Sequence, residues 1–186
     1  MILENTKRKL QTLAGINPVY KLYVFDFDGT LVNSLMPDEG KEIWKQRTKK
    51  EYPHKGWWSK EESLNADVFD IKPIESTMVD YKKAIAEKNS LTVMLTSRIP
   101  KMKDAIMRIL SENGLKFDDY MFKDSNKEKP ERVEDILQKH PDINHIEIWD
   151  DRQKEIDIYA TWKKKVQKNQ EELPIEKKTK IIIHHV

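Results

Sequence analysis

Short apolar runs alternate with amphipathic segments along the chain after residue 20. The runs are rich in β-branched and aromatic residues, which is typical of buried strands, and they lie at residues 21–26, 91–95, 120–122, 146–149 and 179–183. Between them, apolar residues recur at helical spacing over residues 76–88, 101–113, 131–139 and 156–170. Strands that alternate with helices of this length predict an α/β fold, with a central, mostly parallel sheet covered by helices on both faces.

Two regions depart from this alternation. Residues 1–20 mix charged and apolar positions and meet a breaker at Asn17-Pro18, so we expect a short N-terminal helical extension. Residues 33–73 are polar and aromatic and contain proline, glycine and two neighbouring tryptophans, so we expect a small insert of irregular structure around one short helix. The sequence thus predicts a single domain, residues 1–186, that carries one insert.

Composition narrows the class of protein. The chain has 186 residues, and its 34 Lys and Arg nearly balance its 32 Asp and Glu, which excludes a polycation of histone type. The absence of cysteine excludes disulfides, zinc–thiolate and iron–sulfur sites and thiol catalysis. No segment approaches the ~18 consecutive apolar residues of a membrane span, and we expect a cytoplasmic protein.

Chemically capable side chains follow three of the predicted strands. They are Asp26 and Asp28, then Thr96 and Ser97, then Asp150 and Asp151. The carboxyl ends of parallel strands meet at one edge of a sheet, where ligands bind in such folds. Paired carboxylates at that edge suit a hard divalent cation such as Mg²⁺, and Gly29 lets the chain turn tightly beside them.

These residues resemble the motifs of the haloacid dehalogenase (HAD) superfamily. The segment Val24-Phe25-Asp26-Phe27-Asp28-Gly29-Thr30 resembles its first motif, hhhhDxDGT; Leu95-Thr96-Ser97-Arg98 resembles the second, Lys129 before a helix the third, and Asp150-Asp151-Arg152 the fourth. The resemblance runs from residue 21 to residue 186. It implies a Rossmann-like HAD hydrolase in which residues 33–73 form a small cap insert.

A closer resemblance is to the HAD domain called Swiss Army Knife RNA repair-like, and to the phosphatase half of polynucleotide kinase/phosphatases. It rests on Gly56-Trp57-Trp58 and on residues 95–98, 114–118, 125–129 and 150–152. The sequence departs from the common pattern at Ser97, where glycine is common, at Lys123-Asp124, where Lys-Pro is common, and at Glu128, where an aromatic residue is common.

The resemblance and the chemistry of phosphoryl transfer imply a Mg²⁺-dependent phosphomonoesterase with an aspartyl-phosphate intermediate. Asp26 is expected to be the nucleophile and Asp28 the general acid and base. Mg²⁺ would be held by Asp26, the backbone carbonyl of Asp28, and Asp150 or Asp151. Thr96 is expected to contact a phosphoryl oxygen, and Lys129 to offset the charge on Asp26. Ser97 and Lys127 would take these two roles if the alignment is shifted.

Further substrate contacts are expected around these residues, from Gly29, Thr30, Ser97, Arg98, Trp57 and Arg152. For Trp57, stacking on a base competes with packing of the insert against the core. For Arg98 and Arg152, binding of a phosphate competes with a structural ion pair. His184 and His185 are adjacent on a predicted strand and so point to opposite faces, and His140 and His145 are expected in a connecting loop.

A small cap leaves an open site, which favours a macromolecular phosphate, so the first hypothesis is a polynucleotide phosphatase that heals DNA or RNA ends. One alternative is a HAD phosphatase acting on a nucleotide or metabolite. Another is a catalytically silent module that binds metal or phosphate. The chain contains no GxxxxGK[ST] loop, so a kinase of the P-loop type, like a ligase, would be a separate partner.

Overall fold

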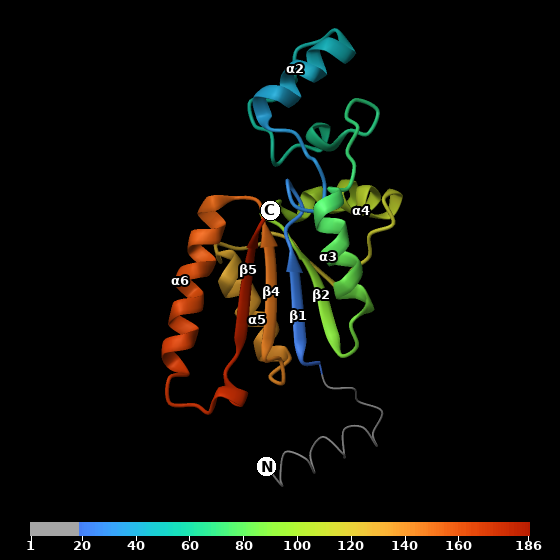
Figure 1. Ribbon diagram of the computed structural model, residues 1–186. Helices are drawn as coiled ribbons and strands as arrows, with labels where there is room; N and C mark the ends of the chain where they lie inside the picture. Colours follow the sequence, from blue (N-terminus) through green and yellow to red (C-terminus); the bar gives the residue numbers. More distant parts are fainter. Residues whose placement is uncertain (1–18) are drawn as a thin grey trace.

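The computed structural model describes residues 19–186, and the helix expected over residues 1–20 falls almost wholly outside them. Five strands form one sheet, with helices on its two faces and the insert beyond one end (Figure 1). The prediction of an α/β fold built on a central parallel sheet is confirmed.

All neighbouring strands of the sheet run parallel, in the order β3-β2-β1-β4-β5. Their bounds are β1 Lys21–Phe25, β2 Ser90–Leu95, β3 Asp119–Met121, β4 His145–Asp150 and β5 Lys180–His185. Successive side chains of β1 enter different hydrophobic clusters, Leu22 and Val24 on one face, Tyr23 and Phe25 on the other. Polar and apolar residues do not alternate along β1, because a central strand of a parallel sheet is buried on both faces.

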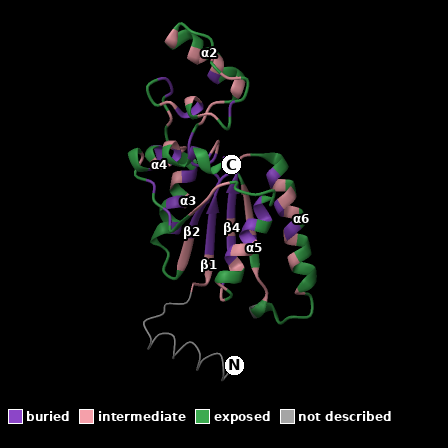
Figure 2. Cartoon of the chain, turned by 180° about the vertical axis from the view of Figure 1, so that it is seen from behind, coloured by how far each residue is buried: buried purple, intermediate pink, exposed green. Residues whose placement is uncertain are grey.

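Two helices cover each face of the sheet. α3 (Glu75–Ala86) and α4 (Lys103–Glu112) pack on the face that carries Tyr23 and Phe25, whereas α5 (Lys129–Lys139) and α6 (Gln153–Asn169) pack on the other. Short 3₁₀ helices, η2 (Pro100–Met102) and η3 (Ile175–Lys177), precede α4 and β5. Figure 2 shows the buried residues along the strands and along the inward sides of these helices.

Two helices begin earlier than the hydrophobic pattern predicts. α5 begins at Lys129 rather than at residue 131, because Glu128 and Glu131 form a reciprocal capping box and Pro130 is tolerated in a first turn. α6 begins at Gln153, three residues before its predicted start. Both additional turns are polar and follow the loops at the strand ends. Apolar periodicity could not detect them, and the first of them contains Lys129.

The insert is more regular than expected. Its helix α2 (Pro37–Thr48) has 12 residues, begins with a proline and ends where Lys49 takes a left-handed conformation with φ 61°. The 3₁₀ helix η1 (Glu61–Leu64) follows. The insert thus has the one α-helix expected, together with a 3₁₀ turn. Its bounds could not be read from the hydrophobic pattern, because α2 buries only Gly40 and its sequence shows little apolar periodicity.

A small hydrophobic cluster holds the insert together, formed by Trp57, Val68 and Phe69. The Trp57 indole N–H donates a hydrogen bond of 3.0 Å to the Leu35 carbonyl. The ring also covers Gly40, where a Cβ atom would lie 2.1 Å from it. The insert therefore has a core of its own, and it stands over the carboxyl ends of the strands (Figure 1).

The histidines of the last two strands contact oxygen atoms on β4 or just after it. His145 is the first residue of β4 rather than part of a loop, because β5 pairs with β4 from this residue on. Its ring lies 2.8 Å from the Glu147 carboxylate, which the His184 ring also contacts at 2.9 Å. His185 faces the other way, toward the Asp151 carbonyl at 3.0 Å.

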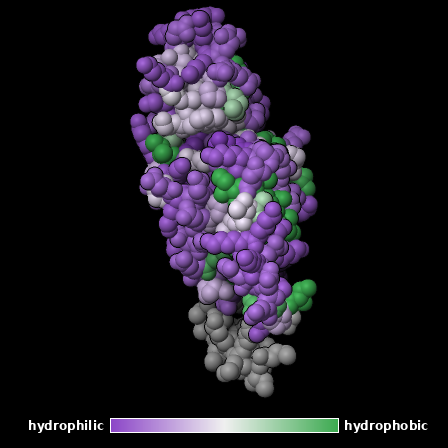
Figure 3. Space-filling model, turned by 90° about the vertical axis from the view of Figure 1, so that its left-hand side faces the viewer, coloured by the Kyte–Doolittle hydropathy of each residue, from purple (hydrophilic) through white to green (hydrophobic). Residues whose placement is uncertain are grey.

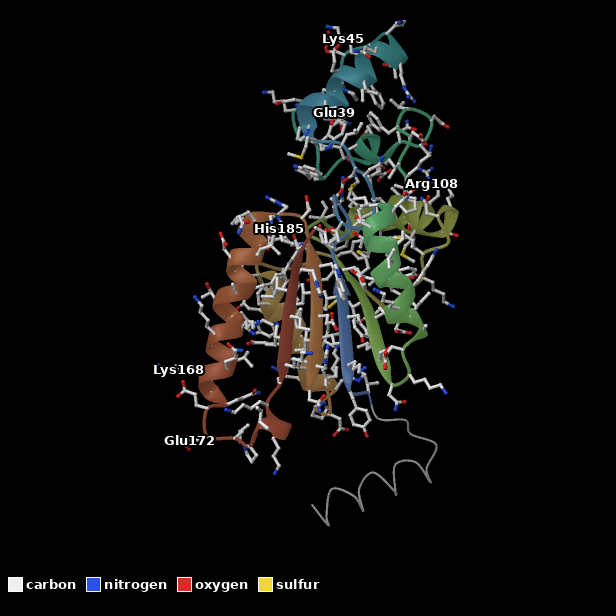
Figure 4. The ribbon with its side chains drawn as sticks, viewed as in Figure 1. Glu39, Lys45, Arg108, Lys168, Glu172 and His185 are labelled. Atoms are coloured by element: carbon white, nitrogen blue, oxygen red, sulfur yellow. The ribbon has the colours of Figure 1, made fainter. Side chains whose placement is uncertain are left out.

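The face of the molecule seen in Figure 3 is mostly hydrophilic, with scattered apolar residues. Figure 4 shows Lys168 and Glu172 at the opposite end of the molecule from the insert, and both are exposed. Within residues 19–186, no helix combines the length and the apolar character needed to cross a membrane.

Candidate active site

The carboxyl ends of β1, β2 and β4 meet beneath the insert. Asp26 directly follows β1, Thr96 directly follows β2, and Asp150 ends β4. Because β1 lies between β2 and β4, these residues are neighbours in space. The Asp26 amide donates to the Trp149 carbonyl at 3.0 Å, and the Thr96 amide donates to the Met121 carbonyl at 2.9 Å. Backbone pairing thus places the polar side chains at one edge of the sheet.

A buried lysine bridges two of these carboxylates. Lys129 Nζ lies 2.7 Å from Asp26 Oδ1 and 2.6 Å from Asp150 Oδ2, and its side chain is 2% exposed. Burial lowers the pKa of this ammonium, but the two carboxylates outweigh it and raise the pKa overall, so Lys129 is charged. Lys127, the alternative lysine, is exposed and pairs with Asp135 at 2.7 Å. The structure therefore brings Lys129, and not Lys127, to the site.

Three carboxylates at this edge suit a divalent cation. Ligand oxygens of Asp26, Asp150 and Asp151 lie within 4.8 Å of one another. Asp151 Oδ1 is buried and has no hydrogen-bond partner among the described residues. Burial raises the pKa of Asp26 to about 8; Lys129 acts to lower it, and the nearby Asp150 and Asp28 raise it further. Burial, together with Asp150, also raises the pKa of Asp151. One ammonium does not balance three carboxylates, and the donor set fits Mg²⁺.

Gly29 makes room for this acidic cluster. It has φ +69°, and a Cβ atom built on it would lie 2.3 Å from Asp151 Oδ2. Both features require glycine, because L-residues rarely adopt such a φ and the carboxylate fills the space. The next residue, Thr30, is fully buried, and its hydroxyl has no partner within residues 19–186. Of the two residues, only Gly29 lines the cavity described below.

Arg98 forms a buried ion pair with Asp28. Its Nε donates to both carboxylate oxygens, at 3.1 and 2.9 Å, and its Nη2 donates to Oδ1 at 2.8 Å. Nη1 donates to the Trp58 carbonyl at 3.0 Å and to Ser63 Oγ at 2.8 Å, both in the insert. The Arg98 side chain is 1% exposed. Of the two hypotheses for Arg98, the geometry matches the structural ion pair, and it links Asp28 to the insert.

The turn after β2 separates two neighbouring hydroxyls. Thr96 is fully buried, and its hydroxyl accepts the Arg98 backbone N–H at 3.1 Å, whereas Ser97 lines the cavity. Arg132, which no sequence motif singled out, donates from Nη1 to the Thr96 carbonyl at 2.9 Å and is 3% exposed. The sequence feature that could have identified Arg132 is its spacing of three residues from Lys129, which places both cations on the same side of α5.

A cavity of about 340 Å³ opens from the carboxylates toward the insert. Its wall includes Ser34, Met36 and Trp58 from the insert, and Ser97, Arg98 and Arg152 from the core. Trp57 is 3% exposed and does not line the cavity, so the packing hypothesis fits this residue and it offers no face to a substrate. Arg152 is exposed, and its guanidinium forms no ion pair within the described chain. The structure thus brings together Asp26, Asp28, Gly29, Ser97, Lys129, Asp151 and Arg152 around one cavity.

Two solved structures resemble the chain at low sequence identity. One is a chain of the Pnkp1/Rnl/Hen1 complex, with 14% identity, a TM-score of 0.51, and coverage of 90% of this chain and 46% of the other. The other is the HAD domain of the effector protein Lem4 from Legionella pneumophila, with 12% identity, a TM-score of 0.50 and coverage of 91% and 87%. At such identities the likeness concerns the fold, and it confirms the HAD fold.

A curated relative is the "Uncharacterized protein YMR265C" of Saccharomyces cerevisiae. It is 26% identical over 170 residues, which cover 77% of this chain and 37% of the relative. The chain thus spans 37% of the yeast protein and 46% of the Pnkp1/Rnl/Hen1 chain, less than half of each.

A family model matches most of the chain. The match covers residues 37–186, which include Thr96 to Arg98, Lys129 and Asp150 to Arg152, and it begins after the Asp26 loop. The expected family and enzyme class, a HAD-type phosphatase, are confirmed. The chain belongs to HAD domain family 1 of the Swiss Army Knife RNA repair proteins.

Proposed function

We propose that this phosphatase is Mg²⁺-dependent, forms an aspartyl-phosphate on Asp26, and removes a terminal phosphate from a nucleic acid. The observation that carries the proposal is the position of Asp26, which is held by Lys129 beside two further carboxylates and lines the cavity. Membership of a family named for RNA repair supports the nucleic-acid substrate.

In the first step, an Asp26 carboxylate oxygen attacks phosphorus and the bond from phosphorus to the leaving oxygen breaks. Asp28 acts as the general acid and gives a proton to that leaving oxygen. Lys129 orients Asp26 through the hydrogen bond of 2.7 Å and lowers the repulsion between this carboxylate and the phosphate. Asp28 remains accessible for this role, since its side chain is 16% exposed beside the buried Arg98.

In the second step, Asp28 takes a proton from a water molecule whose oxygen attacks the same phosphorus. The phosphorus–oxygen bond to Asp26 then breaks, which releases inorganic phosphate and restores both carboxyl groups. The Ser97 hydroxyl at the cavity wall is available to a phosphoryl oxygen, while Thr96 fixes the turn that presents it. Bound by Asp26, Asp150, Asp151 and the Asp28 carbonyl, Mg²⁺ would neutralise charge on the phosphoryl oxygens.

A separate kinase or ligase remains part of the proposal. The chain has no P-loop for phosphorylating an end, so an end trimmed by this phosphatase would be phosphorylated or joined by another chain, or by another part of a longer one.

The test measures phosphate release from DNA and RNA oligonucleotides with 3′- or 5′-terminal phosphates, from mononucleotides and from sugar phosphates, with Mg²⁺ or with EDTA. We expect release from oligonucleotide ends with Mg²⁺, loss of release in Asp26→Asn, and unchanged release in Asp104→Asn, which alters an exposed carboxylate on α4. Activity that survives Asp26→Asn would refute the aspartyl-phosphate.

A second candidate, a phosphatase for a nucleotide or metabolite, is favoured by one observation, the small volume of the cavity. Faster release from mononucleotides or sugar phosphates than from oligonucleotide ends in the same panel would favour it. Absence of release from every substrate, with Mg²⁺ bound, would favour the silent binding module.

A further inference from the structure

Two large apolar side chains of the insert are exposed at the cavity wall. Met36 is 62% exposed and Trp58 is 38% exposed, and both line the cavity that holds Asp26 and Asp28. The hydrolytic steps proposed above use neither side chain. The neighbouring Trp57 is buried in the insert core, so this pair of tryptophans has divided roles, one indole anchoring the insert and one facing the cavity.

The Trp58 ring is held in place before any substrate binds. The Arg98 guanidinium carbon lies 5.2 Å from the ring centroid, a cation–π distance, and Nη1 of the same arginine donates to the Trp58 carbonyl at 3.0 Å. Asp28 and Ser63 fix Arg98 in turn. A rigid aromatic ring loses little conformational freedom when a flat ligand stacks on it, so its position favours binding.

We propose that Trp58, with Met36, binds the nucleobase of the terminal nucleotide whose phosphate reaches Asp26. This rests on the proposed function and names the part of the substrate that the insert recognises. The ring and the nucleophile share one cavity, whose volume of about 340 Å³ is near the lower end for ligand pockets, so it suits a single nucleotide. Every base has a flat π face, so the contact is tolerant of sequence.

One consequence concerns the structure of the end. A base that enters the cavity leaves the stack of a duplex, and this costs free energy that an unpaired end does not require. We therefore infer a preference for single-stranded or overhanging ends over blunt ends. A protein partner on the same two side chains is the competing occupant. It is less favoured because the apolar surface lies inside a cavity with the catalytic carboxylates.

The experiment compares two oligonucleotides with the same terminal phosphate, one with a base on its last nucleotide and one abasic there. The readout is the ratio of kcat/KM for the two. Base stacking contributes about 1–3 kcal/mol by alanine substitution, so Trp58→Ala should lower this ratio by about 5-fold to about 150-fold. Trp58→Phe should keep most of the ratio, and Met36→Ala should lower it less than Trp58→Ala. The matched control is Val79→Ala, which changes an exposed apolar residue of α3 outside the cavity wall.

Fluorescence anisotropy of the same labelled oligonucleotides, measured in EDTA, gives their affinities without turnover. Release from oligonucleotide ends with a ratio that Trp58→Ala leaves unchanged would overturn the base site and keep the proposed function. No release, together with tighter binding of the base-bearing end that Trp58→Ala abolishes, would support the base site and overturn end healing. Equal losses on both oligonucleotides, or equal binding of both by the wild type, would overturn the base site and leave a protein partner as the occupant to test.

Discussion

Lys129→Met removes the cation that bridges Asp26 and Asp150, and we expect it to destabilise the metal-free protein strongly. Methionine fills the space of most of the lysine stem, so the loss is mainly one of charge. Both carboxylates are nearly inaccessible, with side chains 5% and 1% exposed, and they would be left without a counter-charge. Breaking a buried pair by removing one partner costs about 3–5 kcal/mol. For a chain of this size, that corresponds to a Tm lower by about 6–20 °C.

Lys127→Met is the matched control. This lysine lies two residues away and forms a pair of similar length with Asp135, but both side chains are accessible, 48% and 33% exposed. An accessible pair contributes about 0–1 kcal/mol, so the two variants should differ by several-fold in their loss of stability although each removes one lysine ion pair.

Urea unfolding followed by tryptophan fluorescence, in EDTA and in Mg²⁺, measures these free energies. Mg²⁺ should recover more stability in Lys129→Met than in wild type, because the variant has three acidic groups near one another and has lost the ammonium that bridges two of them. The double variant Asp26→Asn with Lys129→Met should lose less than Lys129→Met alone, since one of the unpaired charges is gone. If Lys129→Met in EDTA is as stable as Lys127→Met, the charge balance inferred for the site is wrong.

Three further predictions concern other parts of the site and fold. Arg98→Lys keeps the positive charge but loses the bidentate contact with Asp28. The kcat on a small phosphate ester should therefore fall about tenfold or more, with little change in KM. A kcat of Arg98→Lys equal to that of the wild type would contradict this. Gly29→Ala adds a Cβ atom that displaces the Asp151 carboxylate. We expect kcat/KM to fall by about 100-fold and Mg²⁺ binding measured by calorimetry to weaken, while the circular dichroism spectrum stays that of the wild type. Burial acts to raise the pKa of Glu147, but hydrogen bonds from two histidines outweigh it and lower this pKa below its ordinary 4.5. The stabilising contribution of the carboxylate is therefore present above pH 4.5 and is lost as the pH falls through the lower folded value. The stability difference between wild type and Glu147→Gln should shrink in urea titrations below pH 4.5, and a constant difference would refute the effect.

The sequence by itself determined the class of fold and the edge of the sheet that holds the site. Buried strands in an all-parallel sheet are short apolar runs, and the polar residues that end three of them were visible as breaks in the pattern. Asp26, Thr96 and Asp150 could be placed at one edge because the carboxyl ends of all strands in a parallel sheet lie on the same side. Local chemistry also identified Gly29, since a glycine after a strand-end acid pair indicates a tight turn.

Only the tertiary structure decided what each long polar side chain contacts. Arg98 and Arg152 are equivalent in sequence, each next to a strand-end motif, yet one is buried against Asp28 and the other is exposed at the cavity. Lys127 and Lys129 differ in the same way. A long flexible side chain takes the partner that desolvation and geometry leave open to it, and that partner lies far away in the sequence.

The insert shows the same limit most clearly. Trp57 and Trp58 are adjacent and identical in type, and no pattern in the sequence distinguishes them. Gly40 and Leu35, contributed by the start of α2 and the loop before it, receive the Trp57 ring, so the next indole faces the cavity. The insert buries little apolar surface along its helix, so periodicity predicted it poorly. Its conformation depends instead on contacts between aromatic residues far apart in the chain, which form only on folding.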